Sequence, residues 1–178
     1  MLRKIIIFGA LAGLIVAIPM IAIMVAMNGR PPLEHGMLVG YATMLIALST
    51  VFVAIKRQRD LDGGGVIRFW PAFGLGVGIS AVAGLLYVLA WEASLAITQA
   101  DFIGAYTETL VAEERAKGAS SAAIAKLRAE METFKLSYAN PFFRMPMTFA
   151  EIFPVGVLVS LVSAGLLRNP RFLPARRG

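Results

Sequence analysis

Long apolar runs, separated by charged or turn-forming segments, dominate the chain. They cover residues 5–27, 37–55, 69–98 and 147–167. The first two contain no charged residue, and the other two contain one each, Glu92 and Glu151. A run of about 20 apolar residues is long enough to cross the hydrocarbon core of a bilayer as an α-helix. The pattern predicts an all-α polytopic membrane protein with four transmembrane helices, a single membrane domain of residues 1–178 organised around the third run.

The first run has a competing interpretation, because Arg3 and Lys4 precede it as in a secretory signal peptide. The apolar region of such a peptide is typically about 7–15 residues long. This run is longer, and no small-x-small cleavage site precedes Asn28. We therefore expect a retained helix, bent or locally loosened at Pro19.

The segment between the third and fourth runs, residues 100–144, is polar and has the period of a helix. One apolar stripe recurs at spacings of three and four residues: Ile124, Leu127, Met131, Phe134 and Tyr138. An earlier stripe consists of Phe102, Tyr106 and Leu110. Gly118 lies between the stripes, and Ser120 or Ser121 suits the N-cap of the second helix. We predict an external helical hairpin, with the chain broken again before the fourth run at Asn140-Pro141 and Met145-Pro146.

Lysine and arginine are distributed unevenly between the two sides of the predicted membrane. Ten lie on one side: Arg3, Lys4, Lys56, Arg57, Arg59, Arg68, Arg168, Arg171, Arg176 and Arg177. The other side has Arg30 and the six bases of the insert, which six acids balance. The positive-inside rule then places both termini in the cytoplasm and the hairpin outside. We expect a bacterial inner membrane protein with a hairpin that is periplasmic if the source is Gram-negative.

Composition excludes several classes of function. Hydrophobic residues make up 58% of the 178 residues and charged residues 16%, too few polar groups to cover a soluble domain. The net charge of +6 comes from bases beside apolar runs, which favours contact with lipid headgroups over nucleic acid. The absence of cysteine excludes disulfides, thiolate metal ligands and cysteine nucleophiles.

No motif predicts a reaction. The glycines at positions 74, 76 and 78 lie inside an apolar run with no strand before them, so they are not a nucleotide-binding loop. A P-loop, a nucleophile elbow and an HExxH motif are absent from the sequence. We therefore predict no enzymatic activity and no cofactor.

Four ionisable residues border or interrupt the apolar runs at one predicted level: Glu34, His35, Glu92 and Glu151. A helix rises about 1.5 Å per residue, which puts Glu92 roughly 32 Å from Pro71 and Glu151 about 26 Å from Arg168. Both carboxylates then lie near the external ends of their spans, level with Glu34 and His35. This level is called the rim below.

The rim residues admit two interpretations. If they converge, they form a candidate site for a proton, an ion, a metal or a ligand, and imidazole with carboxylate suits zinc or manganese. Alternatively, each carboxylate is solvated at the interface and hydrogen-bonded to Tyr41, to Trp91 or to helix N-termini. The sequence leaves the identity of any metal open.

Small residues recur at intervals within the runs. They are Gly9 and Gly13, then Gly74, Gly76, Gly78, Ser80 and Gly84, then Gly156, Ser160 and Ala164. Small residues four positions apart share one helical face and allow close helix–helix contact in a membrane. We expect them to pack the bundle, with self-association as the alternative.

Segments that enter and link the spans carry a resemblance to a known family. They are residues 34–41, then Lys56, Arg59-Asp60, Gly63-Gly64, Ile67, Phe69 and Ala72-Phe73, then Asn140-Pro141, residues 151–156 and 159–161. This pattern resembles the bacterial membrane-protein family catalogued as domain of unknown function 4199, over nearly the whole chain. The resemblance implies a four-helix membrane protein and, as the family name says, no established activity or site.

These features favour a non-enzymatic scaffold or accessory subunit in the lipid bilayer, bound to another membrane protein or to a second copy. The alternative is a small transporter or an ion- or ligand-binding bundle that uses the rim. Against this alternative, the inner half of the bundle has no ionisable residue to continue a pathway. A membrane hydrolase or metalloenzyme ranks last, because no catalytic motif supports it.

Overall fold

The computed structural model of the protein describes residues 1–29 and 36–174, and all regular structure in these ranges is helical. The elements are α1 (Leu2–Ala26), α2 (Gly36–Arg57), the π-helix η1 (Gln58–Asp62), α3 (Phe69–Thr98), α4 (Phe102–Ala116), α5 (Ser121–Tyr138) and α6 (Pro141–Leu167). Four of these described segments are long and apolar enough to cross a membrane: α1, α2 with η1, α3 and α6. The predicted fold class is confirmed.

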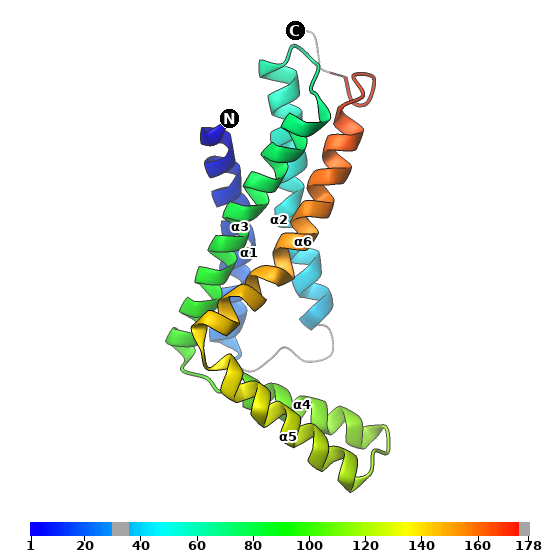
Figure 1. Cartoon of the computed structure of the whole chain (residues 1–178). Coiled ribbons are helices and arrows are strands. Elements are labelled where there is room, and N and C mark those ends of the chain that lie inside the picture. The colour runs from blue at the N-terminus through cyan, green and yellow to red at the C-terminus, as the bar shows by residue number, and fades with distance from the viewer. Residues whose placement is uncertain (30–35, 175–178) are drawn as a thin grey trace.

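The four long helices stand side by side, and the α4–α5 hairpin projects obliquely from one end (Figure 1). The N-terminus and the end of the described chain lie at the opposite end, here called the terminal end. Helix α3 is the most buried of the four and packs against both α1 and α6. The third run is therefore the centre of the bundle, as its length and glycine content indicated.

Helices α3 and α6 run antiparallel and touch through small residues. A Cβ atom built on Gly156 would lie 2.5 Å from the Cβ of Ser80, and one on Gly76 would lie 2.6 Å from the Oγ of Ser160. Each serine hydroxyl donates back to its own helix, Ser80 to the carbonyl of Gly76 and Ser160 to that of Gly156. The glycines are needed here because any side chain would push the backbones apart.

Helices α1 and α3 use the same device, since Gly9 lies against Val82 and Gly13 against Leu86. The expectation that small residues pack the bundle is confirmed at these contacts. It is wrong for Gly74, where an added Cβ would meet no atom within 4 Å.

One buried arginine connects two segments at the terminal end. Arg59 lies in η1, which continues α2 beyond the expected end at residue 55, and its side chain is fully buried. Its guanidinium donates to the carbonyls of Phe172 (2.8 Å) and Leu173 (2.5 Å) and, through Nε, to Asp60 (2.7 Å). A buried guanidinium is tolerated only when its donors are satisfied, so this residue ties the chain after α6 to the end of α2.

The fourth span begins earlier than the apolar run. Asn140 caps α6 by accepting from the N–H of Phe142, and Pro141 occupies the first turn, where its missing N–H costs no helical bond. The expected break at Met145-Pro146 is wrong, because Pro146 lies inside α6. The first turns of α6 therefore belong to the span helix and not to the polar insert.

The hairpin follows the sequence signals. Ser120 caps α5 by accepting from the N–H of Ala123, and Gly118 in the turn has a φ of +82°, which favours glycine. Ile103 and Val111 of α4 and Ile124 of α5 are buried. Ile124 belongs to the stripe predicted for α5. In α4 the buried residues are not those of the predicted stripe, since Phe102 and Leu110 are only partly buried and Tyr106 is exposed.

Candidate functional site

The rim residues divide into two groups. Glu92 lies in the last turns of α3, and Glu151 lies in α6, about 10 Å below Arg144 at 1.5 Å per residue. Glu34 and His35 lie outside the described residues, so the convergence of all four stays a prediction.

Glu92 forms an ion pair with Arg144 of α6. The guanidinium donates from Nε to Oε1 (2.7 Å) and from Nη2 to Oε2 (2.5 Å), a two-bond geometry that fixes both side chains. Its Nη1 also donates to the carbonyl of Tyr138, and the guanidinium lies 5.5 Å from the centre of the Tyr138 ring. Only 22% of the Glu92 side chain and 14% of the Arg144 side chain are exposed. Both carboxylate oxygens of Glu92 therefore accept hydrogen bonds from Arg144 within the protein.

Aromatic side chains surround this ion pair. The indole N–H of Trp91 donates to the hydroxyl of Tyr138 (2.7 Å), and the Trp91 ring meets Phe102 edge-on at 4.9 Å. Phe102 stacks on Tyr106, and Tyr138 packs against Phe134. These contacts join α3, α4 and α5. We call Trp91, Glu92, Tyr138 and Arg144 the rim cluster.

The Tyr138 hydroxyl reports the charges around it. Burial has the largest influence and raises its pKa, as do the negative charges of Glu151 and Glu92. The hydrogen bond from Trp91 and the positive charge of Arg144 lower it, and the resulting pKa is about 12. Tyr138 therefore stays neutral at physiological pH.

Glu151 is held differently from Glu92. Its Oε2 accepts from the hydroxyl of Tyr87 on α3 (3.2 Å), and no ion pair involves Glu151 within residues 1–29 and 36–174. Tyr87 is buried, whereas the Glu151 side chain is exposed on the surface of the bundle. In those same ranges, no three histidine or carboxylate side chains are grouped in a way that could hold a metal ion.

A family match extends across this arrangement. The family model described as "Protein of unknown function (DUF4199)" matches residues 7–169, from within α1 to just past α6. The chain belongs to this family. Comparisons with curated proteins and with solved structures give no match. Membership confirms the resemblance seen in the spans and assigns no activity to the rim of this DUF4199 protein.

Sequence reasoning missed the partners of the predicted carboxylates. Arg144 was counted with the bases of the insert, although Asn140-Pro141 is a helix-start signal that places Arg144 in the first turns of α6. Tyr87 gave no signal, and Tyr138 was recognised only as part of the α5 stripe, because periodicity does not say which side chains meet across two helices. Among the described residues, the rim of this DUF4199 protein thus contains one ion pair, Glu92 with Arg144, and one further carboxylate, Glu151, bound by Tyr87.

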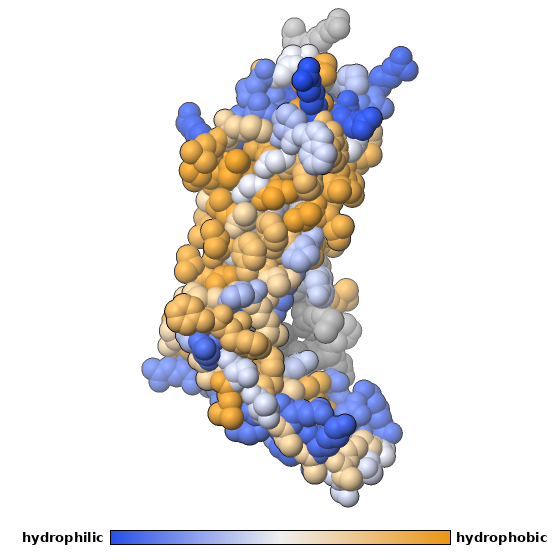
Figure 2. All heavy atoms as spheres, in the orientation of Figure 1, coloured by the Kyte–Doolittle hydropathy of each residue, from blue (hydrophilic) through white to orange (hydrophobic). Residues whose placement is uncertain are grey.

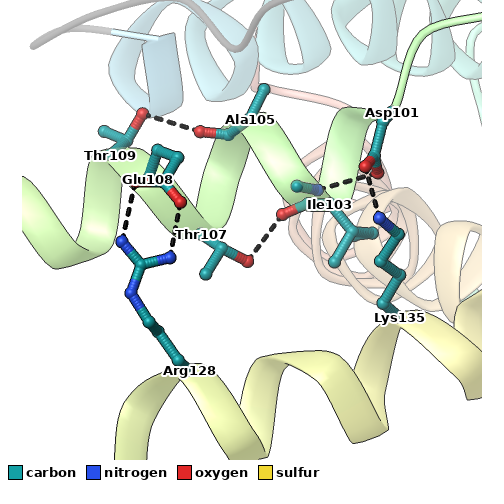
Figure 3. A network of polar contacts seen from close by, with 9 residues as sticks. Asp101, Ile103, Ala105, Thr107, Glu108, Thr109, Arg128 and Lys135 are labelled. Carbon is teal, nitrogen blue, oxygen red and sulfur yellow. Dashed lines mark hydrogen bonds and ion pairs between the residues drawn. The ribbon is translucent and has the colours of Figure 1, made fainter. Parts of the chain in front are cut away.

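The hairpin carries a second polar region (Figure 3). Arg128 of α5 donates to both carboxylate oxygens of Glu108 on α4 (2.6 and 2.9 Å), and Lys135 donates to Asp101. These bonds hold the pKa values of Glu108 and Asp101 below their ordinary range. A cleft of about 640 Å³ lies between the two helices here. Arg128 and Lys135, the bases that line this cleft, are already paired with Glu108 and Asp101, so these ion pairs connect α4 to α5.

Proposed function

We propose that this DUF4199 protein is a non-enzymatic scaffold or accessory subunit that presents its hairpin, in a fixed orientation, to another membrane protein. The rim cluster is the observation that supports this proposal. An arginine bound through two bonds to a largely buried carboxylate, with a tyrosine hydroxyl held by an indole, resists rotation of the hairpin about its base. A rigid arm is useful for binding, because little conformational entropy is lost when the partner is met.

The partner contact in this proposal is the base of the hairpin. Much of the apolar stripe of α5 is shielded within the protein, as Ile124 is buried and Phe134 packs against Tyr138 and Phe143. Large apolar side chains nevertheless stay exposed where α5 meets α6: Leu136 is 71% exposed and Phe142 89%. Exposed aromatic groups beside a polar surface are typical of the centre of a protein interface.

The proposal includes an orientation, with both termini in the cytoplasm and the hairpin on the outer face of a bacterial inner membrane. Figure 2 shows an apolar band between two hydrophilic ends, as a spanning bundle requires. Described bases crowd the terminal end: Arg3, Lys4, Lys56, Arg57, Arg59, Arg68, Arg168 and Arg171. Only Asp60 and Asp62 oppose them there, whereas acids balance the bases of the hairpin. The positive-inside rule supports this orientation.

The experiment is site-specific photo-crosslinking in native membranes. A photoreactive residue at Leu136 or Phe142 should give one discrete adduct, whose mass distinguishes a second copy from another protein. The matched controls are Lys126, exposed on the middle of α5, and Leu85, exposed on the apolar band. The Phe142 adduct should disappear in an Arg144→Gln background at equal protein level. An equal adduct from Lys126, or an adduct unaffected by Arg144→Gln, would contradict the proposal.

A further inference from the structure

Arginines gather at the terminal end without acidic partners. The two lysines there form ion pairs within the protein, Lys4 with Asp62 and Lys56 with Asp60. Five exposed arginines form no ion pair with any residue in 1–29 and 36–174: Arg3, Arg57, Arg68, Arg168 and Arg171.

The rest of the chain supplies no further acidic side chain at this end. Residues 175–178 contain two more arginines and no aspartate or glutamate. Glu34 comes two positions before the start of α2, roughly 30 Å along that helix from Arg57. The excess of guanidinium groups at the terminal end therefore follows from the whole sequence.

The register of α3 against α6 is regular in the middle of the bundle. Gly156 of α6 lies against Ser80 of α3, and Gly76 of α3 lies against Ser160 of α6. Each step of four residues back along α3 therefore matches a step of four residues forward along α6.

Continued towards the terminal end, this register brings two of the arginines to facing positions. The next step reaches Ala72 and Ala164, which are both fully buried in one core cluster. The step after that reaches Arg68, just before the first residue of α3, and Arg168, just after the last residue of α6. Two like charges thus occupy facing positions at the ends of adjacent helices.

These positions lie at the level of lipid headgroups. Helix α3 has 30 residues and α6 has 27, so each is about 40–45 Å long, the thickness of a bilayer with its headgroup regions. Trp70, two positions from Arg68, is 75% exposed, and tryptophan is enriched at membrane interfaces. Leu166, two positions from Arg168, is also exposed. Figure 2 shows the hydrophilic terminal end directly above the apolar band.

We propose that Arg68 and Arg168 bind the phosphate of an anionic phospholipid between them. A planar guanidinium can donate two parallel N–H bonds to a phosphate, whereas a lysine ammonium acts as a point charge. At the hairpin end the register places the carboxylate of Glu92 opposite Arg144, but at the terminal end the anion has to come from outside the protein.

The net charge of the headgroup decides which phospholipid fits. A zwitterionic headgroup brings its own positive charge close to the two arginines, so a headgroup with a net negative charge is favoured. Its acyl chains then lie beside the exposed side chains of Trp70 and Leu166. This inference does not depend on the proposed scaffold function.

The test measures which lipid lies beside Trp70 in the full chain. The protein is placed in phosphatidylcholine bilayers in which a small share of the lipid carries bromine near the top of its acyl chains, because bromine quenches tryptophan fluorescence on contact. The brominated lipid is phosphatidylglycerol in one sample and phosphatidylcholine in the other. The chain has only two tryptophans, so the Trp70→Phe variant gives the signal of Trp91 alone. Brominated phosphatidylglycerol should quench the Trp70 signal several-fold more than the same share of brominated phosphatidylcholine.

Two double variants separate a bound lipid from general attraction to a basic surface. Arg68→Gln with Arg168→Gln should remove the preference for phosphatidylglycerol. Arg3→Gln with Arg57→Gln removes the same charge from the same end and should keep most of that preference. Equal quenching by the two brominated lipids in the unchanged chain would overturn the inference, and so would an equal loss of preference in the two double variants. If a double variant does not fold, the single changes Arg68→Gln and Arg3→Gln, both on exposed side chains, give the same comparison.

Discussion

The two halves of the contact between α3 and α6 are built from different chemistry. Towards the terminal end the helices meet through Gly76, Ser80, Gly156 and Ser160, where backbone approaches backbone. Towards the hairpin end the same helices meet through large polar and aromatic groups, Tyr87 with Glu151 and Glu92 with Arg144. In the first half a larger side chain would clash with the facing helix. In the second half single hydrogen bonds or ion pairs can be removed by substitution. The difference separates what folds this protein from what orients its hairpin.

One helical register connects the two halves. Position 76 of α3 lies opposite 160 of α6, and 80 lies opposite 156, so four residues forward on α3 match four residues back on α6. The same register places Glu92 opposite Arg144. The small-residue half therefore sets the alignment from which the rim cluster follows.

Breaking the small-residue half should have the largest effect. Gly156→Val would force a side chain into Ser80, and overpacking of this kind costs about 3 kcal/mol of stability at the upper end of its range. Thermal unfolding in detergent measures the loss. Gly165→Val is the control, since a Cβ there meets no atom within 4 Å. Equal stability of the two variants would refute close α3–α6 packing at this point.

Removing the ion pair should come second and should act on the hairpin more than on the bundle. Arg144→Gln leaves Glu92 largely buried without its partner; with 22% of that side chain exposed, we expect a loss of about 2 kcal/mol, less than for a fully buried pair. Limited proteolysis should cut near residues 139–140 in the variant first. The double variant Glu92→Gln with Arg144→Gln should recover part of the loss. Full additivity of the two changes would contradict a direct pair.

The helices and the hairpin were predictable because length, apolar runs and capping residues are local signals. Ser120, Gly118 and the limits of the third span needed no tertiary information. The contacts of Glu92 and Glu151 were not predictable, since they depend on the rotation of α3 against α6. Arg59 shows this limit most clearly. From the sequence, a base beside a span indicates only the side of the membrane on which it lies, but in the structure Arg59 is fully buried and donates to the carbonyls of Phe172 and Leu173.

Removing the hydroxyl of Tyr138 should have a smaller effect than removing the ion pair. Tyr138→Phe keeps the ring below Arg144 but leaves the indole N–H of Trp91 without its acceptor, at a cost of about 1 kcal/mol. Thermal unfolding should show the shift. Trp91→Phe also loses packing against Phe102, so the bond is measured by a double-mutant cycle: the two changes together should cost less than the sum of their separate costs. Full additivity would show that the bond is not what the hydroxyl contributes.

The bridge within the hairpin should have the smallest effect, and only in acid. The pKa of Glu108 is lowered from its ordinary 4.5 by Arg128, so the bridge contributes fully above that pH and is lost as the pH falls through the lowered value. Spin labels on α4 and α5 should move apart over that acid range. Arg128→Gln should remove the part of the pH dependence that comes from Glu108 and leave the part that comes from Asp101 and Lys135. Lys126→Gln, whose partner Glu130 is on the same helix, should leave both parts in place.

The orientation of the hairpin is the most direct test of the account. The chain has no cysteine, so spin labels can be placed at Leu85→Cys on the bundle and Lys126→Cys on α5 without background. Pulsed electron paramagnetic resonance in lipid nanodiscs then gives the distribution of distances between them. The account predicts one narrow distribution that becomes broad when Arg144→Gln is added. A broad distribution before that change, or a narrow one that survives it, would show that the rim cluster does not fix the hairpin.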